Sequence, residues 1–213
     1  MRWEEIAKDS GSVAIEPPGN VVVHRACSWK IIYTAGSKGI ATGGGLRVVI
    51  PYGFSPPQNH HVTGTGFTTV SVSNPDVKAF LHMYDPKSDV DHLKGWGANS
   101  STWGLNIYVQ IEERDLAPGE NITIEYGAGP GDGAFVRYFE GICEFTVFVD
   151  PDGSRSAPRG GFYLIDGEQP KLRVVADEPS KLFITIPSRA TVDEPIDAKI
   201  TVRDREGNTV NDF

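Results

Sequence analysis

Histidines and one nearby aspartate are the residues in this sequence best suited to bind a metal. His60 and His61 are adjacent, His82 and His92 follow, and Asp85 lies between the last two. Imidazole and carboxylate groups together can hold a transition metal. Adjacent side chains point in opposite directions along an extended chain, so only one of His60 and His61 would readily join such a site.

The spacing of these residues does not fix two of them on one face. The sequence contains neither an HExxH pattern nor a His-x-His pair. His82 lies in a strand-like segment, where a hydrogen-bonded structural histidine is the commoner arrangement. We therefore expect no catalytic residue, no metal and no other cofactor in this chain. If a metal does bind, the candidate ligands are His61, His82, Asp85 and His92.

Aromatic residues in polar loops offer a different chemistry, the stacking of a sugar ring. Trp96 and Trp103 flank the polar residues 97–102, and Tyr52 and His60 lie in an earlier loop. Ring faces could stack on a sugar while Asn, Asp and Gln side chains bind its hydroxyl groups. The alternative is that both indoles close the ends of the core, with their N–H groups hydrogen-bonded. The candidate substrate-binding residues are Tyr52, His60, Trp96 and Trp103.

Short strand-like segments occupy most of the chain and must position these side chains. They are rich in β-branched and aromatic residues, and clusters of Gly, Pro, Asn and Asp separate them. The expected strands include residues 21–23, 29–33, 46–50, 67–73, 77–83, 105–111, 121–126, 144–149 and 162–165. Such a series predicts an all-β fold built as an antiparallel β-sandwich, rather than alternating strands and helices.

A domain boundary is predicted at residues 167–170, where Gly and Pro interrupt the strand patterns. Residues 1–167 would form the β-sandwich domain, and residues 168–213 a partial immunoglobulin-like segment. An immunoglobulin domain has about seven strands. Three strand patterns follow the boundary, at residues 172–175, 181–186 and 198–203. We therefore expect the first strands of an incomplete immunoglobulin-like domain, and a chain that is the front part of something longer.

The last residues have the features of an open sheet edge. A turn at residues 204–208 follows the final strand pattern, and residues 209–213 look like the start of the next strand. Two or three strands are marginally stable alone, and an uncovered edge tends to pair with another strand. We therefore expect this edge to be covered by a domain in cis, by a partner chain, or by a second copy in a homo-oligomer.

Three stretches of the sequence, taken in order, resemble a known family. They are residues 29–58 (WKIIYTAGSKGIATGGGLRVVIPYGFSPPQ), residues 117–153 (APGENITIEYGAGPGDGAFVRYFEGICEFTVFVDPDG) and the immunoglobulin-like opening that follows residue 186. Together they resemble the N-terminal region of an uncharacterised bacterial family whose later part is a PHP-like, metal-dependent hydrolase domain. The resemblance implies that a β-sandwich and an immunoglobulin-like segment precede the metal-binding domain. The Asp-Leu-His type of opening of that domain is absent here, so no metal chemistry is transferred to any residue of this chain.

The net charge and the hydrophobicity of the chain argue against nucleic acid and membrane as partners. The 213 residues carry a net charge of −8, which is opposite to the basic face that nucleic acid requires. No apolar run approaches the roughly 20 residues that span a bilayer, and the start of the chain lacks a signal-peptide pattern. We therefore expect a soluble, cytoplasmic protein that binds neither nucleic acid nor membrane. Cys27 and Cys143 predict two free, buried thiols, with a single disulfide as the alternative in an oxidising compartment.

These observations favour a non-catalytic accessory region that positions substrate within a larger metal-dependent hydrolase-like protein. Its partner would be a metal-dependent hydrolase domain in cis or on another chain. Two alternatives remain open from the residues alone. One is a carbohydrate-binding module, and the other is a subunit of an enzyme that a partner chain completes.

Overall fold

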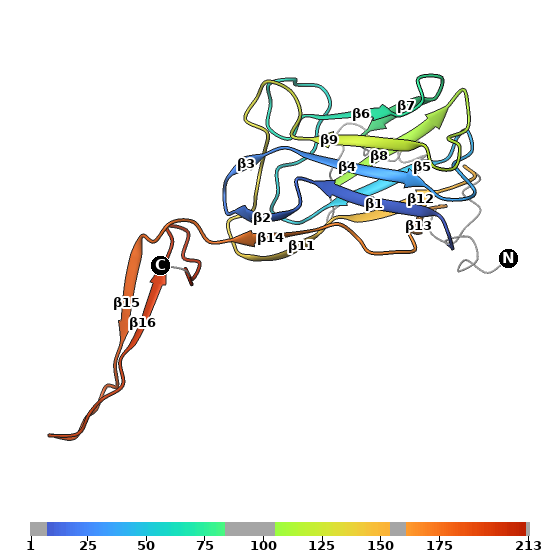
Figure 1. Cartoon of the computed structure of the whole chain (residues 1–213). Helices are drawn as coiled ribbons and strands as arrows, with labels where there is room; N and C mark the ends of the chain where they lie inside the picture. The colour runs from blue at the N-terminus through green and yellow to red at the C-terminus, as the bar shows by residue number, and fades with distance from the viewer. Residues whose placement is uncertain (1–7, 84–104, 154–160, 212–213) are drawn as a thin grey trace, which may run out of the picture.

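A computed structural model describes residues 8–83, 105–153 and 161–211 of the chain. These residues form β-strands and the connections between them, and they contain no helix. Most of the strands stack as a sandwich, from which one hairpin projects (Figure 1). The predicted all-β sandwich is therefore confirmed.

Two antiparallel sheets make up the body of the sandwich. The first has the order β1-β4-β9-β6 and the second has the order β13-β12-β5-β8-β7. The first sheet contains β1 (Gly11–Glu16), β4 (Trp29–Ala35), β9 (Asn121–Tyr126) and β6 (Thr68–Val72). The second contains β13 (Tyr163–Leu164), β12 (Thr146–Asp150), β5 (Gly45–Ile50), β8 (Leu105–Glu112) and β7 (Lys78–His82).

Alternating residues of these strands fill the core between the sheets. In β8, Ile107, Val109 and Ile111 are buried, as the period-two pattern predicts. In β9, Ile122 and Ile124 are buried in the same cluster from the opposite sheet. Each strand therefore contributes one apolar face to the core and turns its other face outward.

A third, smaller sheet extends the sandwich. One of its strands follows the predicted domain boundary in the sequence. It has the order β11-β14-β2, with β11 (Gly141–Glu144), β14 (Lys171–Val175) and β2 (Gly19–Val22). β14 follows residues 167–170 in the sequence, where the boundary was expected, yet it pairs with two strands that precede them. Leu172 and Val174 of β14 are buried in the main core. Their burial explains why β14 lies with the sandwich and not with the segment that follows.

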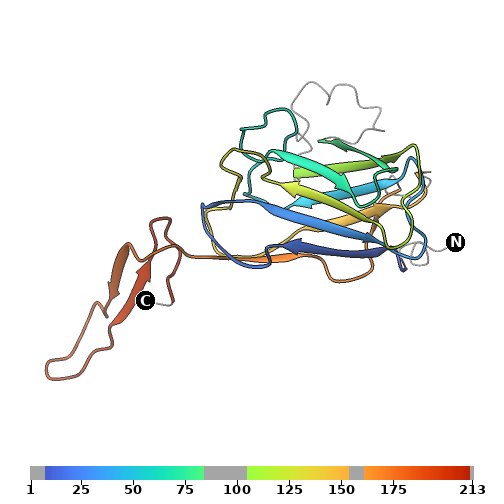
Figure 2. The same ribbon diagram turned by 45° about the horizontal axis from the view of Figure 1, so that its top comes forward.

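The segment after β14 forms a hairpin of β15 (Lys181–Thr185) and β16 (Lys199–Arg203). Figures 1 and 2 show this hairpin extending away from one end of the sandwich. Its apolar residues Leu182, Ile184 and Ile200 are exposed. The chain then turns back, since the Val210 N–H donates to the Val202 carbonyl and Thr209 bridges to Arg203. A strand was expected to start at residue 209; the structure has an isolated bridge there, and residues 212–213 lie outside the described part of the chain.

The remaining short pair joins β10 (Ala134–Phe135) to β3 (Ala26–Cys27) at the end of the sandwich that carries the hairpin. Cys27 is half-buried, Cys143 is buried, and both are free thiols. Burial raises the pKa of each thiol. Within the described part of the chain, no helix is long and apolar enough to cross a membrane.

Candidate functional site

Two of the four candidate substrate-binding residues lie in one connection, residues 51–67 between β5 and β6. Tyr52 is 81% exposed, and His60 is also exposed. Trp96 and Trp103, the other two, fall outside the described residues, as do the candidate metal ligands Asp85 and His92.

The Gln58 side chain organises the turn that carries His60 and His61. Its Oε1 accepts the backbone N–H groups of His60 at 3.0 Å and His61 at 2.8 Å. Its Nε2 donates to the carbonyls of His61 at 2.8 Å and Gly64 at 3.2 Å. The backbone of the turn is therefore fixed, while both imidazole rings remain at the surface.

A hydrogen bond from a side chain of this turn links it to β7, the strand that carries His82. Asn59 Nδ2 donates to the carbonyl of Leu81 in β7 at 3.1 Å. His82 is half-buried; burial lowers the pKa of its imidazole, and Glu112 opposes that shift. Among residues 8–83, 105–153 and 161–211, no three His, Cys, Asp or Glu side chains gather closely enough to hold a metal ion.

Exposed rings lie on two segments that pack against each other, the 51–67 connection and residues 136–140. We call Tyr52, His24, Arg137, Tyr138 and Phe139 the aromatic rim. The His24 ring lies 4.3 Å from the Tyr138 ring, centroid to centroid, and the Arg137 guanidinium carbon lies 4.3 Å from the Phe139 ring centre. Tyr138 is 54% exposed and Phe139 is 46% exposed. Large rings that share one exposed patch mark a binding surface more often than scattered ones do.

Close backbone packing holds the two halves of the rim together. Gly53 has a φ of +85°, and a Cβ atom at this position would lie 2.8 Å from Cβ of Arg137. Only glycine allows this approach, which brings the backbone beside Tyr52 against Arg137. Below it, Phe54 is buried in the core, and Ser55 Oγ accepts the N–H of Phe135 at 2.9 Å.

Arg137 fixes the other half of the rim. Its Nε donates to the Phe139 carbonyl at 2.9 Å and its Nη2 donates to the Glu140 carbonyl at 3.2 Å. The guanidinium therefore stacks on the Phe139 ring while it ties down the backbone on both sides of that ring. Rigid ring faces bordered by N–H donors are suited to binding a ligand that has apolar faces and hydroxyl edges.

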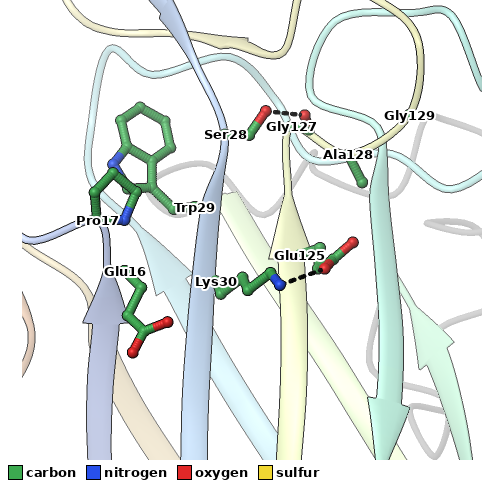
Figure 3. A pocket seen from close by; sticks show the side chains of 9 residues that line it. All are labelled: Glu16, Pro17, Ser28, Trp29, Lys30, Glu125, Gly127, Ala128 and Gly129. Carbon is green, nitrogen blue, oxygen red and sulfur yellow. Dashed lines mark hydrogen bonds and ion pairs between the residues drawn. The ribbon is translucent and has the colours of Figure 1, made fainter.

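A second candidate is a shallow hollow of about 440 Å³ on the first sheet (Figure 3). Glu16, Lys30 and Glu125 reach it from three neighbouring strands, β1, β4 and β9. Lys30 Nζ lies 3.4 Å from Glu125 Oε1, and Ser28 Oγ donates to the Gly127 carbonyl at 2.5 Å. Two of the three charged groups of the hollow, Lys30 and Glu125, are therefore already paired with each other across the sheet.

We expect the substitution Lys30→Ala to lower the free energy of unfolding by less than about 0.5 kcal/mol. Both side chains of the Lys30–Glu125 pair are about half exposed, at 55% and 43%, so water screens their attraction. Urea denaturation of the two proteins measures the difference. A loss above about 1 kcal/mol would show that this pair holds the strands together, contrary to the behaviour of surface pairs.

No family model matches the chain, and no curated protein matches it. One solved structure to which the chain is similar is that of AvmM, which is described as catalysing macrocyclization in alchivemycin A biosynthesis. The two share 13% sequence identity, with 83% of this chain and 94% of the other covered, and the TM-score is 0.39. A similarity of this degree carries no information about activity.

Sequence reasoning found Tyr52 but missed the other four members of the rim. The adjacent pair Tyr138–Phe139 was the available signal, because two consecutive large rings cannot both enter the core from one extended segment. His24 gave no signal in the sequence. Its place in the rim depends on its φ of +53° and on the bond from its N–H to the Arg137 carbonyl at 3.2 Å.

Proposed function

We propose that this chain is a non-catalytic, ligand-binding β-sandwich that holds a saccharide on its aromatic rim. The observation that carries the proposal is the exposure of Tyr52, Tyr138 and Phe139 on two segments that pack together where Gly53 meets Arg137. A sugar ring has an apolar C–H face that can cover an aromatic ring and hydroxyl groups that can meet nearby donors. Fixed rings lose little conformational entropy on binding, which favours affinity.

The experiment compares variants of the rim in binding to a panel of neutral polysaccharides. We expect Tyr52→Ala and Tyr138→Ala each to weaken binding about tenfold, because burial of about 60 Å² of ring surface is worth about 1.5 kcal/mol. Affinity electrophoresis with soluble glucans, xylans and mannans gives the dissociation constants.

Phe183→Ala is the matched control, since Phe183 is 45% exposed but lies on the hairpin strand β15. It should leave polysaccharide binding unchanged. The proposal fails if no member of the panel binds, or if the Phe183 substitution weakens binding as much as the rim substitutions do.

We further propose that the bound saccharide is presented to a metal-dependent hydrolase, in cis or on a partner chain. The support is the resemblance of residues 29–58 and 117–153 to the region before such a domain, together with the hairpin. The exposed Leu182, Ile184 and Ile200 would be covered by further strands of an immunoglobulin-like domain. The mass of the native protein in its source cells tests whether the hydrolase domain is part of the same chain. A native product of the size of this chain alone would exclude that arrangement and direct the search to a partner chain.

A further inference from the structure

A row of side chains crosses the outward face of the second sheet, on the side away from the core. The register pairs Phe148 of β12 with Arg47 of β5, and Arg47 with Tyr108 of β8. Tyr108 in turn lies opposite His82 of β7. The neighbours Val48, Ile107 and Val147 point into the core, so this row points outward.

Arg47 is held in one orientation within this row. Its guanidinium carbon lies 5.3 Å from the Phe148 ring centre and 6.0 Å from the Tyr108 ring centre. Its Nε donates to Oδ1 of Asn106 at 3.0 Å, and Asn106 is only 5% exposed. The two rings and the amide therefore fix the plane of the guanidinium before any ligand arrives, which lowers the entropic cost of binding.

The charge of Arg47 is not neutralised by the protein in the part that the structure describes. The ion pairs there involve other basic groups, namely Arg25, Lys30, Arg114 and Lys171. The side chain is also half-buried, which strengthens its attraction for an anion relative to a fully exposed arginine.

We propose that Arg47 anchors a carboxylate-bearing sugar, such as a uronic acid, at a second site distinct from the aromatic rim. The planar guanidinium matches a carboxylate by two parallel N–H···O bonds. Phe148 and Tyr108, which flank the guanidinium, supply apolar surface for the ring that carries the carboxylate. The proposal goes beyond the neutral-saccharide function of the rim and does not depend on it.

The test titrates the whole chain with glucuronate and with an oligogalacturonate. Glucose serves as the uncharged control ligand. We expect both acidic sugars to shift the Arg47 ε-NH signal in NMR spectra, and we expect binding to weaken as salt rises. Arg47→Lys keeps the positive charge but removes the two parallel N–H donors of the guanidinium, so it should weaken binding at least tenfold. Arg173→Lys, at an exposed position of β14, is the matched control and should have no effect.

The outcomes separate this site from the rim. Binding of glucuronate that survives Tyr52→Ala but not Arg47→Lys supports the second site, whatever the polysaccharide panel shows. Equal binding of glucose and glucuronate, or full binding by a folded Arg47→Lys variant, would overturn it. Thermal unfolding of each variant, followed by circular dichroism, establishes that the variant is folded.

Discussion

The substitution Phe145→Ala is expected to lower the free energy of unfolding by about 3–5 kcal/mol. The Phe145 side chain is fully buried and packs against Phe54, with ring centres 5.8 Å apart, and against Trp29, with ring centres 6.5 Å apart. Trp29 in turn stacks on Tyr126 at 5.9 Å. Truncation would leave a cavity beside the rings of Phe54 and Trp29, which cannot close it without leaving their own positions. Equilibrium denaturation in urea measures the loss.

Phe80→Ala provides the control for this prediction. Phe80 lies on β7 and is 45% exposed, so its removal creates no closed cavity. We expect a change within about 1 kcal/mol. If Phe145→Ala lowers the free energy of unfolding by no more than Phe80→Ala does, the aromatic cluster repacks freely, and the prediction is wrong.

Removal of the Asp204 carboxylate is expected to release the hairpin from the sandwich while the sandwich stays folded. Asp204 is fully buried at the base of the hairpin. Its carboxylate accepts the N–H of Asp177 at 3.1 Å, the N–H of Asn208 at 2.7 Å and Nδ2 of Asn208 at 2.9 Å. Asn208 thereby reaches the rim segment, where its Nδ2 donates to the Tyr138 carbonyl at 2.9 Å and its Oδ1 accepts the Glu140 N–H at 3.1 Å.

In Asp204→Ala, we expect this attachment to weaken by about 2–3 kcal/mol, because three donors lose a charged acceptor. Hydrogen exchange with peptide-level resolution measures the effect. The amides of residues 177–210 should exchange about a hundredfold faster, while those of β8 and β9 keep their protection. Uniformly faster exchange across the whole chain would contradict the prediction, since it would show that the hairpin and sandwich unfold together.

Acid should have the same effect on the natural sequence. Burial raises the pKa of the Asp204 carboxyl, but the hydrogen bonds from Asn208, Asp177 and Gly207 together outweigh burial and hold that pKa below its usual range. A carboxyl with a depressed pKa stabilises the fold above the pKa of the unfolded chain, near 3.9, and loses this contribution as the pH falls through the folded value. Release of the hairpin is therefore expected below about pH 4. In Asp204→Asn this titrating step should be missing from the pH dependence of exchange.

The strands with one buried face were the part of the fold that the sequence predicts well. β9 occupies residues 121–126, as expected, because Ile122, Ile124 and Tyr126 alternate with polar residues and all three are buried. β1 was not predicted. Ile15 is the one residue of β1 buried enough to belong to the core, so its strand state comes from pairing along β4 rather than from its own pattern.

The aromatic rim and the base of the hairpin could be predicted only in part, because distant segments build them. Tyr52 was identified from its loop, but the residues beside it come from positions 24 and 137–139. The turn at residues 204–208 was also recognised from its Gly and Asn. That Asn208 would bind residues 138–140 depends on where β14 leaves the sandwich, and no local pattern in the turn encodes that position.

The parallel pairing of β2 with β14 has a consequence for how the protein acquires its structure. Val21 meets Val174, so strands from near the two ends of the sandwich must find each other across almost its whole sequence. Contacts this distant make folding slow, on the scale of roughly milliseconds to seconds in small domains. On the ribosome, at about 5–20 residues per second, β14 is made roughly 8–30 s after β2. Throughout that interval a nascent chain holds an unpaired strand at its start, and it is then most exposed to association with other chains.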